Sequence, residues 1–248
     1  MQQEQIAYRR LPLQGAPNTR DLGGYPCPAG ITRWRQFVRS SSTHSITAPD
    51  IAFLEEYGIT TVIDLRGPRE CEAHPSALAA HGNFALHNIP LLGQMDASGF
   101  EGDVPGSMAG LYIELLDNRQ AALLSVFKTI LAASGGILFH CTAGKDRTGI
   151  VAMLLLKLAG VRDDDIVADY SITDIHMGAV FMGPNPDFKE DEIPSFVFHS
   201  KPRSMWRTLS HLSSQYGSAK KFLLQAGLTS DEIKLLEQKI VYPIFAKQ

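Results

Sequence analysis

The sequence predicts an α/β protein in which a central, mostly parallel sheet is flanked by helices, with further helices at its carboxyl end. Three observations support this. Short β-branched and apolar runs alternate with longer segments of helical periodicity. The apolar run 136–139 leads through a small loop into a second apolar segment, 150–158, which is the order strand, loop, helix. Beyond residue 160 the pattern is helical throughout.

The first third of the chain predicts alternating strands and helices. Residues 18–24 hold Asn, Asp and two glycines and predict a loop. A strand is expected over 31–40, followed by a helix over 49–57 that Gly58 ends. The β-branched run 60–66 is typical of a buried parallel strand. Short helices and one more strand complete this part, at 69–70, 77–80 and 84–90.

The middle of the chain contains its longest stretch without periodicity, residues 93–106, which include four glycines. A long loop in a compact domain is usually functional or disordered, and here it predicts a lid. A helical segment with a break at 117–118 follows over 111–133. The chain then enters the central strand, the small loop and a helix that ends at Gly160.

The last third predicts helices. Residues 163–165 are all aspartates, which favour a helix start, so a metal site there is the weaker interpretation. Residues 181–202, rich in proline and phenylalanine, predict a packed connector, with an apolar rim over the active site as the alternative. Helices over 203–226 follow, and a capping box at 229–232 begins a final helix that extends to Val241.

Composition excludes several classes of function. The net charge of −3 gives no general attraction to nucleic acid or to acidic membranes. The three cysteines are an odd number without paired spacing, which argues against a disulfide framework and against a zinc site. The histidines are scattered and lack the spacing of metal ligands. We therefore expect no metal and no cofactor. Without a signal peptide pattern or a membrane-spanning apolar run, we expect a cytoplasmic protein without integral membrane contact, although a mature exported protein would look the same.

The chain is organised around residues 140–149, His-Cys-Thr-Ala-Gly-Lys-Asp-Arg-Thr-Gly. A loop of this size before a helix allows successive backbone amides to converge on one anion. The Arg147 side chain can add two hydrogen bonds to phosphate oxygens of the same anion. The positive potential of the loop favours the thiolate form of Cys141. A cysteine at the end of a buried strand is usually an inert apolar residue. The preceding His, the Gly and the Arg-Thr-Gly at the helix start favour an active site instead.

This segment resembles the signature His-Cys-x5-Arg-Ser/Thr of the cysteine-dependent protein tyrosine phosphatase superfamily. Two segments resemble one branch, the bacterial tyrosine and dual-specificity phosphatases with phosphoinositide activity: Ala-Gly-Lys-Asp-Arg-Thr-Gly at 143–149 and Asn-Thr-Arg-Asp-Leu-Gly-Gly at 18–24. The resemblance covers about residues 11–160. We expect a single phosphatase domain over 1–248, in which about 161–248 form a helical extension packed on the same core.

The mechanism expected from this resemblance is two-step phosphoryl transfer. Cys141 attacks the phosphorus of a phosphomonoester and forms a cysteinyl-phosphate. Arg147 and the loop amides stabilise the equatorial oxygens. The expected substrate-binding residues are Thr142, Ala143, Gly144, Lys145 and Thr148. This account requires that the Cys141 sulfur is accessible to solvent and that the amides surround a tetrahedral anion.

A leaving group needs a proton, and most tyrosine phosphatases supply it from a separate Trp-Pro-Asp loop. Trp34 and Trp206 are each followed by arginine, so neither belongs to such a loop. Asp146 resembles the in-loop acid of the bacterial branch and is the first candidate, with Asp96 and Asp103 as alternatives. Nearby positive charge favours the ionised carboxylate, which opposes this role.

Two residues of the motif have predicted supporting roles. His140 is expected to donate a hydrogen bond to the backbone beneath the loop rather than to carry protons. Thr148 is expected to hydrogen-bond the Cys141 thiolate, to cap the helix, or both. Lys145 would add charge at the mouth of the loop, where it could favour phosphoinositides, or would simply be solvated.

Residues outside the motif have two readings each. Asp64, at the end of a predicted central strand, either pairs with its neighbours or lies beside the loop and tunes its protons. Arg20 and Asp21 form either an ordinary surface pair or, by resemblance, a brace beneath the loop.

The function expected is hydrolysis of phosphotyrosine, with phosphoserine, phosphothreonine and phosphoinositides as further candidate substrates and inorganic phosphate as product. Two alternatives remain. The first is a catalytically inactive domain that only binds phosphorylated ligands, and the second is an arsenate-reducing or sulfur-transfer enzyme with a similar anion loop. The presence of Cys141, Asp146 and Arg147 argues against the first alternative. Cys27 and Cys71 show no link to the loop, which argues against the second.

Overall fold

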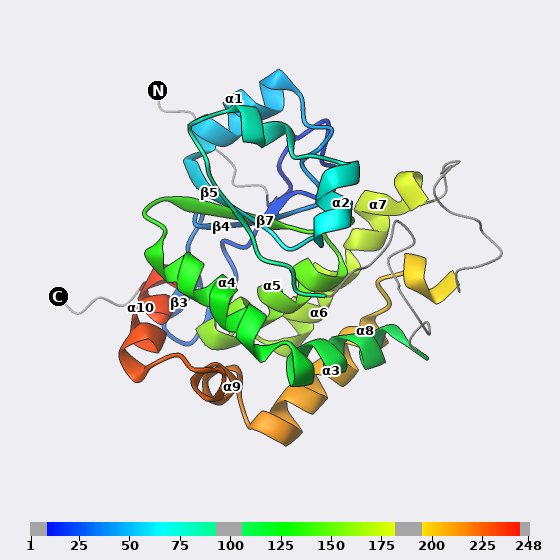
Figure 1. The fold of residues 1–248 in the computed structure, drawn as a ribbon. Coiled ribbons are helices and arrows are strands. Elements are labelled where there is room, and N and C mark those ends of the chain that lie inside the picture. Colours follow the sequence, from blue (N-terminus) through cyan, green and yellow to red (C-terminus); the bar gives the residue numbers. More distant parts are fainter. Residues whose placement is uncertain (1–8, 93–105, 182–194, 244–248) are drawn as a thin grey trace.

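The computed structural model describes residues 9–92, 106–181 and 195–243 (Figure 1). Its main sheet has the order β1-β4-β7-β5-β6, in which β1 is antiparallel to β4 and the other neighbours are parallel. The prediction of an α/β fold with a mostly parallel central sheet is therefore confirmed. The strands are β1 (Arg20–Asp21), β4 (Phe37–Ser40), β7 (Gly136–His140), β5 (Ile59–Asp64) and β6 (Ala85–Asn88).

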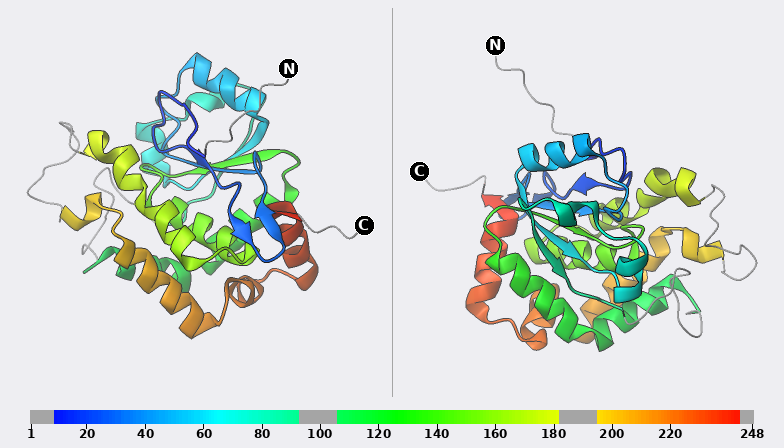
Figure 2. Two further views of the ribbon diagram at one scale, coloured as in Figure 1. Left: turned by 180° about the vertical axis from the view of Figure 1, so that it is seen from behind. Right: turned by 45° about the horizontal axis from the view of Figure 1, so that its top comes forward.

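Helices cover both faces of this sheet (Figures 1 and 2). On one face lies α1 (Ala48–Tyr57), while α3–α6 and α8–α10 lie on the other. The remaining bounds are α2 (Pro68–Ala73), α3 (Met108–Asn118), α4 (Gln120–Ala132), α5 (Asp146–Ala159), α6 (Asp163–Ser171), α7 (Thr173–Phe181), α8 (Pro202–His211), α9 (Ala219–Ala226), α10 (Ser230–Ile240) and the short helices η1 (Ala77–Ala80), η2 (Ser195–Phe198) and η3 (Leu212–Tyr216).

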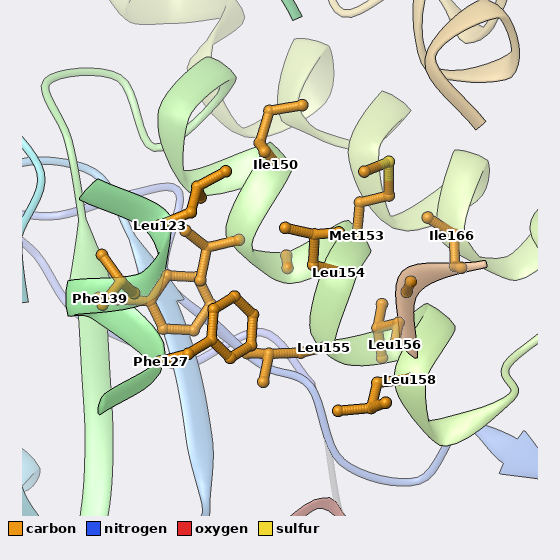
Figure 3. Close-up of a cluster of buried hydrophobic side chains, with 14 of the residues drawn as sticks. Leu123, Phe127, Phe139, Ile150, Met153, Leu154, Leu155, Leu156, Leu158 and Ile166 are labelled. Atoms are coloured by element: carbon orange, nitrogen blue, oxygen red, sulfur yellow. The ribbon is translucent and has the colours of Figure 1, made fainter. Parts of the chain in front are cut away.

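The central strand β7 places alternate side chains in two cores, as the two-residue period of a strand requires. Leu138 joins the core beneath α1, whereas Ile137 and Phe139 join the larger core on the other face. Helix α5 is apolar on nearly every side and is buried in that larger core (Figure 3). Strand and helix are both enclosed, so the loop that joins them has fixed ends.

Two predictions about the ends of the chain are wrong. The expected strand over 31–40 is two strands, β3 (Gly30–Thr32) and β4, because Arg35 between them adopts a left-handed φ of 62°. The final helix ends at Ile240, and the chain beyond residue 160 is not wholly helical, because β8 (Val241–Pro243) pairs with β3. With β2 (Pro26–Cys27), these strands form a second, antiparallel sheet in the order β2-β3-β8.

Other predicted elements are close to those observed. The break in the long helix falls at Arg119, and the helix that the three aspartates begin is α6. The capping box of α10, between Thr229 and Glu232, is formed. The predicted lid lies outside the described residues apart from Gly106, as does the larger part of the predicted connector. Among the described residues, no helix is both long and apolar enough to cross a membrane.

Candidate active site

The loop between β7 and α5 is held from outside through four consecutive carbonyl oxygens. Thr142 accepts from the Ser42 amide at 2.9 Å, and Ala143 accepts from Asn18 Nδ2 at 2.8 Å. Arg39 Nη2 donates to the carbonyls of Gly144 at 2.8 Å and Lys145 at 3.4 Å. The loop conformation is thus set by donors on other segments of the chain.

The amide side of the same loop is left for a ligand. In the described part of the chain, the backbone N–H groups of Thr142, Ala143 and Gly144 donate to no protein acceptor. Gly144 has a left-handed φ of 67°, and a Cβ there would lie 2.3 Å from the Ser40 carbonyl oxygen. Only glycine fits this close approach. Unpaired amides ahead of a helix start are the usual donors of an anion site.

Cys141 lies at the floor of this loop. The residue is 2% exposed and belongs to the larger hydrophobic core, so the expectation of an openly accessible sulfur is wrong for this structure, and this burial counts against the mechanism that was expected to require it. Its position explains the burial, because it directly follows the fully enclosed strand β7. A phosphoryl group must therefore enter the loop to meet this sulfur.

Arg147, in the first turn of α5, pairs with a carboxylate that sequence reasoning missed. Its Nη1 lies 2.6 Å from Glu70 Oε2, and its Nη2 lies 2.8 Å from Oε1. Glu70 also accepts from the hydroxyl of Thr142 at 2.5 Å and from the Gly67 amide at 2.8 Å. Burial opposes its ionisation, but these contacts outweigh burial and lower the pKa of Glu70.

A buried ion network lies beneath the loop. Asp169 on α6 accepts from Arg20 Nε at 2.9 Å and also pairs with Arg39, the residue that holds the loop carbonyls. Arg20 in turn donates to Asn18 Oδ1 at 2.6 Å. Although burial opposes ionisation, the two arginines lower the pKa of Asp169 to about 2. Arg39 and Asp169 were not singled out from the sequence.

Arg20 and Asp21 do not form a surface pair, because both are buried. Arg20 supports the loop indirectly, through Asn18 and Asp169. Asp21 instead accepts hydrogen bonds from the Gly23 amide at 2.6 Å and, with its other oxygen, from the Arg35 amide at 2.7 Å and the hydroxyl of Tyr57 at 2.6 Å. It therefore fixes the turns beside β1 and makes no contact with the loop.

His140 and Asp64 lie side by side at the carboxyl ends of β7 and β5. The Nδ1–H of His140 donates to its neighbour's carbonyl, the oxygen of Cys141, at 3.2 Å, as the expected backbone contact requires. Burial lowers the pKa of His140, so it is neutral. Asp64 receives two-point hydrogen bonding from Arg66 and lies 3.7 Å from His140 Nε2. Both readings of Asp64 thus hold in part: it pairs with a neighbour and lies beneath the loop.

Asp146 is the first residue of α5, and a hydrogen-bonded pair of tyrosines lies against its side chain. The hydroxyl of Tyr112 donates to its Oδ1 at 2.5 Å, and the hydroxyl of Tyr170 is 2.6 Å from that of Tyr112. The Asp146 side chain is 22% exposed, so it is partly open to solvent while it contacts these buried tyrosines. The alternative acids, Asp96 and Asp103, lie outside the described residues.

Lys145 and Thr148 differ from the predictions. Lys145 is 1% exposed, and its Nζ donates to the carbonyl of Val197 and, at 3.5 Å, to that of His199. It lies beneath η2 rather than solvated at the loop mouth, because these carbonyls compensate the buried charge. The Oγ1 of Thr148 is buried without a hydrogen-bond partner among the described residues, so it neither bonds Cys141 nor caps α5 in this structure.

The described residues do not contain the usual arrangement of metal ligands. No group of three or more histidine, cysteine, aspartate or glutamate side chains in them has an arrangement that could hold an ion.

A parallel sheet whose central strand ends in a Cys-x5-Arg loop, before a buried helix, defines the class of cysteine-dependent phosphatase folds. The chain belongs to the tyrosine phosphatase family, which it matches over residues 11–242. It is 33% identical over 221 residues to a tyrosine-protein phosphatase of Nostoc commune, covering 82% of this chain and 74% of that protein.

A second relative is the triple specificity protein phosphatase PtpB of Mycobacterium tuberculosis, which is 31% identical over 196 residues. That match covers 66% of this chain and 68% of PtpB. The solved structure of TpbA from P. aeruginosa is a more distant likeness, with a TM-score of 0.41 and 14% identity over 84% of this chain and 98% of that one.

Proposed function

We propose that this protein, acting as a single domain, hydrolyses phosphotyrosine through a cysteinyl-phosphate on Cys141. The observation that carries the proposal is the orientation of the loop: its carbonyls are held from outside, while the amides of Thr142 to Gly144 have no protein acceptor. A phosphoryl group bound there would meet the sulfur of Cys141 at the floor. The Sγ–P bond forms as the ester P–O bond breaks, and water later releases inorganic phosphate.

Arg147 is proposed to clamp the phosphoryl oxygens. Its three hydrogen bonds to described residues all come from Nη1 and Nη2, which face Glu70 and Thr142. The Nε edge and the loop amides together supply donors for an anion. Glu70 fixes the plane of the guanidinium, so that the donors are oriented before substrate binds. Such preorganisation is a large part of electrostatic catalysis.

Asp146 is the proposed general acid. Its position at the first turn of α5, one residue before the proposed phosphate clamp Arg147, supports this role. As the P–O bond breaks, its electron pair stays on the ester oxygen, which takes the proton from Asp146. Asp146→Asn should then lose far more activity on an alkyl phosphate than on p-nitrophenyl phosphate, whose leaving group needs no proton. Equal, near-normal turnover of both esters would rule this acid out.

Phosphoserine, phosphothreonine and phosphoinositides are proposed as further substrates. The relative PtpB is named a triple specificity phosphatase, which supports a site that accepts more than one ester. Lys145 supports the phosphoinositide proposal less than its sequence position suggests, because its charge is compensated by buried carbonyls. A panel of phosphotyrosine, phosphoserine and phosphothreonine peptides and a phosphoinositide tests this, with Lys145→Met as the variant. Absence of activity on the phosphoinositide would show that phosphoinositides are not substrates of this protein.

The arsenate-reducing alternative requires a second reactive thiol. Cys71 directly follows Glu70, so it is nearer to the loop than the sequence indicated, and the Asp64 carboxylate lies 3.6 Å from its sulfur. Burial and Asp64 raise the pKa of Cys71 to about 11, which keeps it a poorly reactive thiol. This supports phosphatase chemistry. The three cysteines are unpaired, and we propose the reducing cytoplasm as the compartment.

A further inference from the structure

Asp146 is the end of a hydrogen-bonded chain that runs into the protein interior. Tyr112, on α3, lies 2.5 Å from Asp146 Oδ1, and Tyr170, on α6, lies 2.6 Å from the Tyr112 oxygen. Each hydroxyl has one proton. Because the hydroxyl of Tyr112 donates its hydrogen bond to Asp146, its oxygen must accept a hydrogen bond from Tyr170. The direction of hydrogen bonding is therefore from Tyr170 to Tyr112 to Asp146.

The two tyrosines of this hydrogen-bonded chain are buried and packed against each other. Tyr112 and Tyr170 are 0% and 1% exposed, and their rings meet edge to face with centroids 5.8 Å apart. Burial, together with the nearby Asp146 carboxylate, raises the pKa of both tyrosines well above the ordinary value, so both hydroxyls stay protonated. A hydrogen bond from a buried donor of this kind restricts the orientation of the carboxyl group.

Several other groups face this cluster. Lys145 Nζ is 3.6 Å from the same Oδ1, and Arg147 and Cys141 lie on the same loop and helix start. Asp174 on α7 and Arg39 on β4 act on Tyr170. The two cations, Lys145 and Arg147, already have other partners, Val197 and Glu70. Tyr112 is therefore the neutral donor that is directed at Asp146.

We propose that Tyr112, supported by Tyr170, is a positioning residue for Asp146: it binds Oδ1 and leaves Oδ2 to give its proton to the leaving group. This inference rests on the proposed function. While Asp146 is protonated on Oδ2, Oδ1 still accepts from Tyr112. When the proton moves to the ester oxygen, the same hydrogen bond stabilises the new carboxylate. The interaction strengthens as the reaction proceeds, which is the condition for lowering the barrier.

The consequence is a specific change in pH dependence. A hydrogen bond donated to a carboxylate favours its ionised form. Tyr112→Phe removes that donor and retains the ring, so the carboxyl group keeps its proton to higher pH. The alkaline limb of the kcat profile should move upward by roughly one pH unit. At the pH optimum, kcat on an alkyl phosphate should fall by about tenfold, with a smaller fall on p-nitrophenyl phosphate.

The matched control is the pair Tyr216 and Asp117, in which a tyrosine hydroxyl also donates to a carboxylate, at 2.7 Å, away from the loop. Tyr216→Phe should leave both limbs of the pH profile in place. Tyr170→Phe keeps the donor to Asp146 and loses only its support, so its shift should have the same direction and a smaller size. Urea unfolding of each variant verifies that it is folded, and Tyr170→Phe serves as the test if Tyr112→Phe does not fold.

Two measurements separate this inference from the proposed function. The first compares kcat profiles on alkyl and aryl phosphate for the wild type, Tyr112→Phe and Asp146→Asn. If Asp146→Asn loses alkyl phosphatase activity while Tyr112→Phe leaves the alkaline limb unmoved, the acid stands and the inference is overturned. The second is carbon-13 NMR titration of the Asp146 carboxyl group, which needs no turnover. A midpoint that is higher in Tyr112→Phe than in the wild type supports the inferred action of Tyr112 on the Asp146 carboxyl group without relying on turnover, and an unchanged midpoint overturns the inference.

Discussion

Arg147 and Glu70 form a two-point ion pair at the edge of the loop, with Nη1–Oε2 and Nη2–Oε1 distances of 2.6 and 2.8 Å. The two residues come from different elements, α5 and α2, and both side chains are nearly buried. This pair connects the helix after β5 to the helix after β7. The orientation of the guanidinium thus depends on a segment far away in the sequence.

Glu70→Gln should lower kcat/KM for p-nitrophenyl phosphate by roughly 10- to 100-fold. The amide retains the size of the side chain but can accept from only one of the two Nη groups, and a hydrogen bond between charged groups contributes roughly 1.5–3 kcal/mol. Steady-state kinetics measures the change. Glu72→Gln, on the exposed side of the same helix, makes the same charge change and should be neutral. Equal kinetics for the two variants would show that Glu70 does not orient Arg147.

Asp169→Asn should reduce the free energy of unfolding at pH 7 by about 3–5 kcal/mol, because it leaves two buried arginines without their carboxylate. Arg39 would also lose its anchor beneath the loop, so activity should fall in the fraction that remains folded. Urea unfolding gives the first quantity and kinetics the second. Asp164→Asn, exposed on the same helix, should change stability by less than about 0.5 kcal/mol.

The same aspartate predicts how stability depends on pH. Its pKa is about 2 in the folded protein and close to 4 in an unfolded chain, so the unfolded state takes up the proton first as pH falls. The stabilisation is complete above about pH 4 and is lost as pH falls from about 4 to about 2. Denaturant unfolding from pH 7 to pH 3 should therefore show the difference between wild type and Asp169→Asn shrinking only at the acid end. A difference that declines between pH 7 and pH 5 would contradict this assignment.

Gly144→Ala should inactivate the protein and destabilise it. The left-handed φ of 67° costs an L-residue roughly 1–2 kcal/mol, and the added Cβ would be forced against the Ser40 carbonyl. The loop must move, which displaces the amides from the anion site. Gly82→Ala is the control, because a Cβ there meets nothing within 4 Å. Urea unfolding and binding of inorganic phosphate measure the two effects, and normal phosphate affinity in Gly144→Ala would contradict the proposed cradle.

The parallel sheet and the candidate loop could be predicted because each is indicated by a short, contiguous segment of the sequence. Residues 140–149 are contiguous, and β-branched runs such as that of β5 indicate buried strands without any knowledge of their partners. Helix α5 follows from its apolar composition. The second sheet was not predictable in the same way, because β8 is a three-residue strand whose partner, β3, lies near the other end of the chain.

The supporting residues were missed for the same physical reason. Glu70 meets Arg147 across 77 positions of sequence, and Asp169 meets Arg39 across 130, so no spacing rule connects them. The burial of Lys145 depended on a contact with Val197, which no local pattern indicates.

The central claim is that the Cys141 sulfur carries the phosphoryl group during turnover. Its most direct test is mass spectrometry of the enzyme quenched in acid while it hydrolyses p-nitrophenyl phosphate, with Cys141→Ser beside it. The account predicts a phosphorylated peptide that contains Cys141 in the wild type, and neither that peptide nor phosphate release in Cys141→Ser. Phosphate release by Cys141→Ser at the wild-type rate would contradict it.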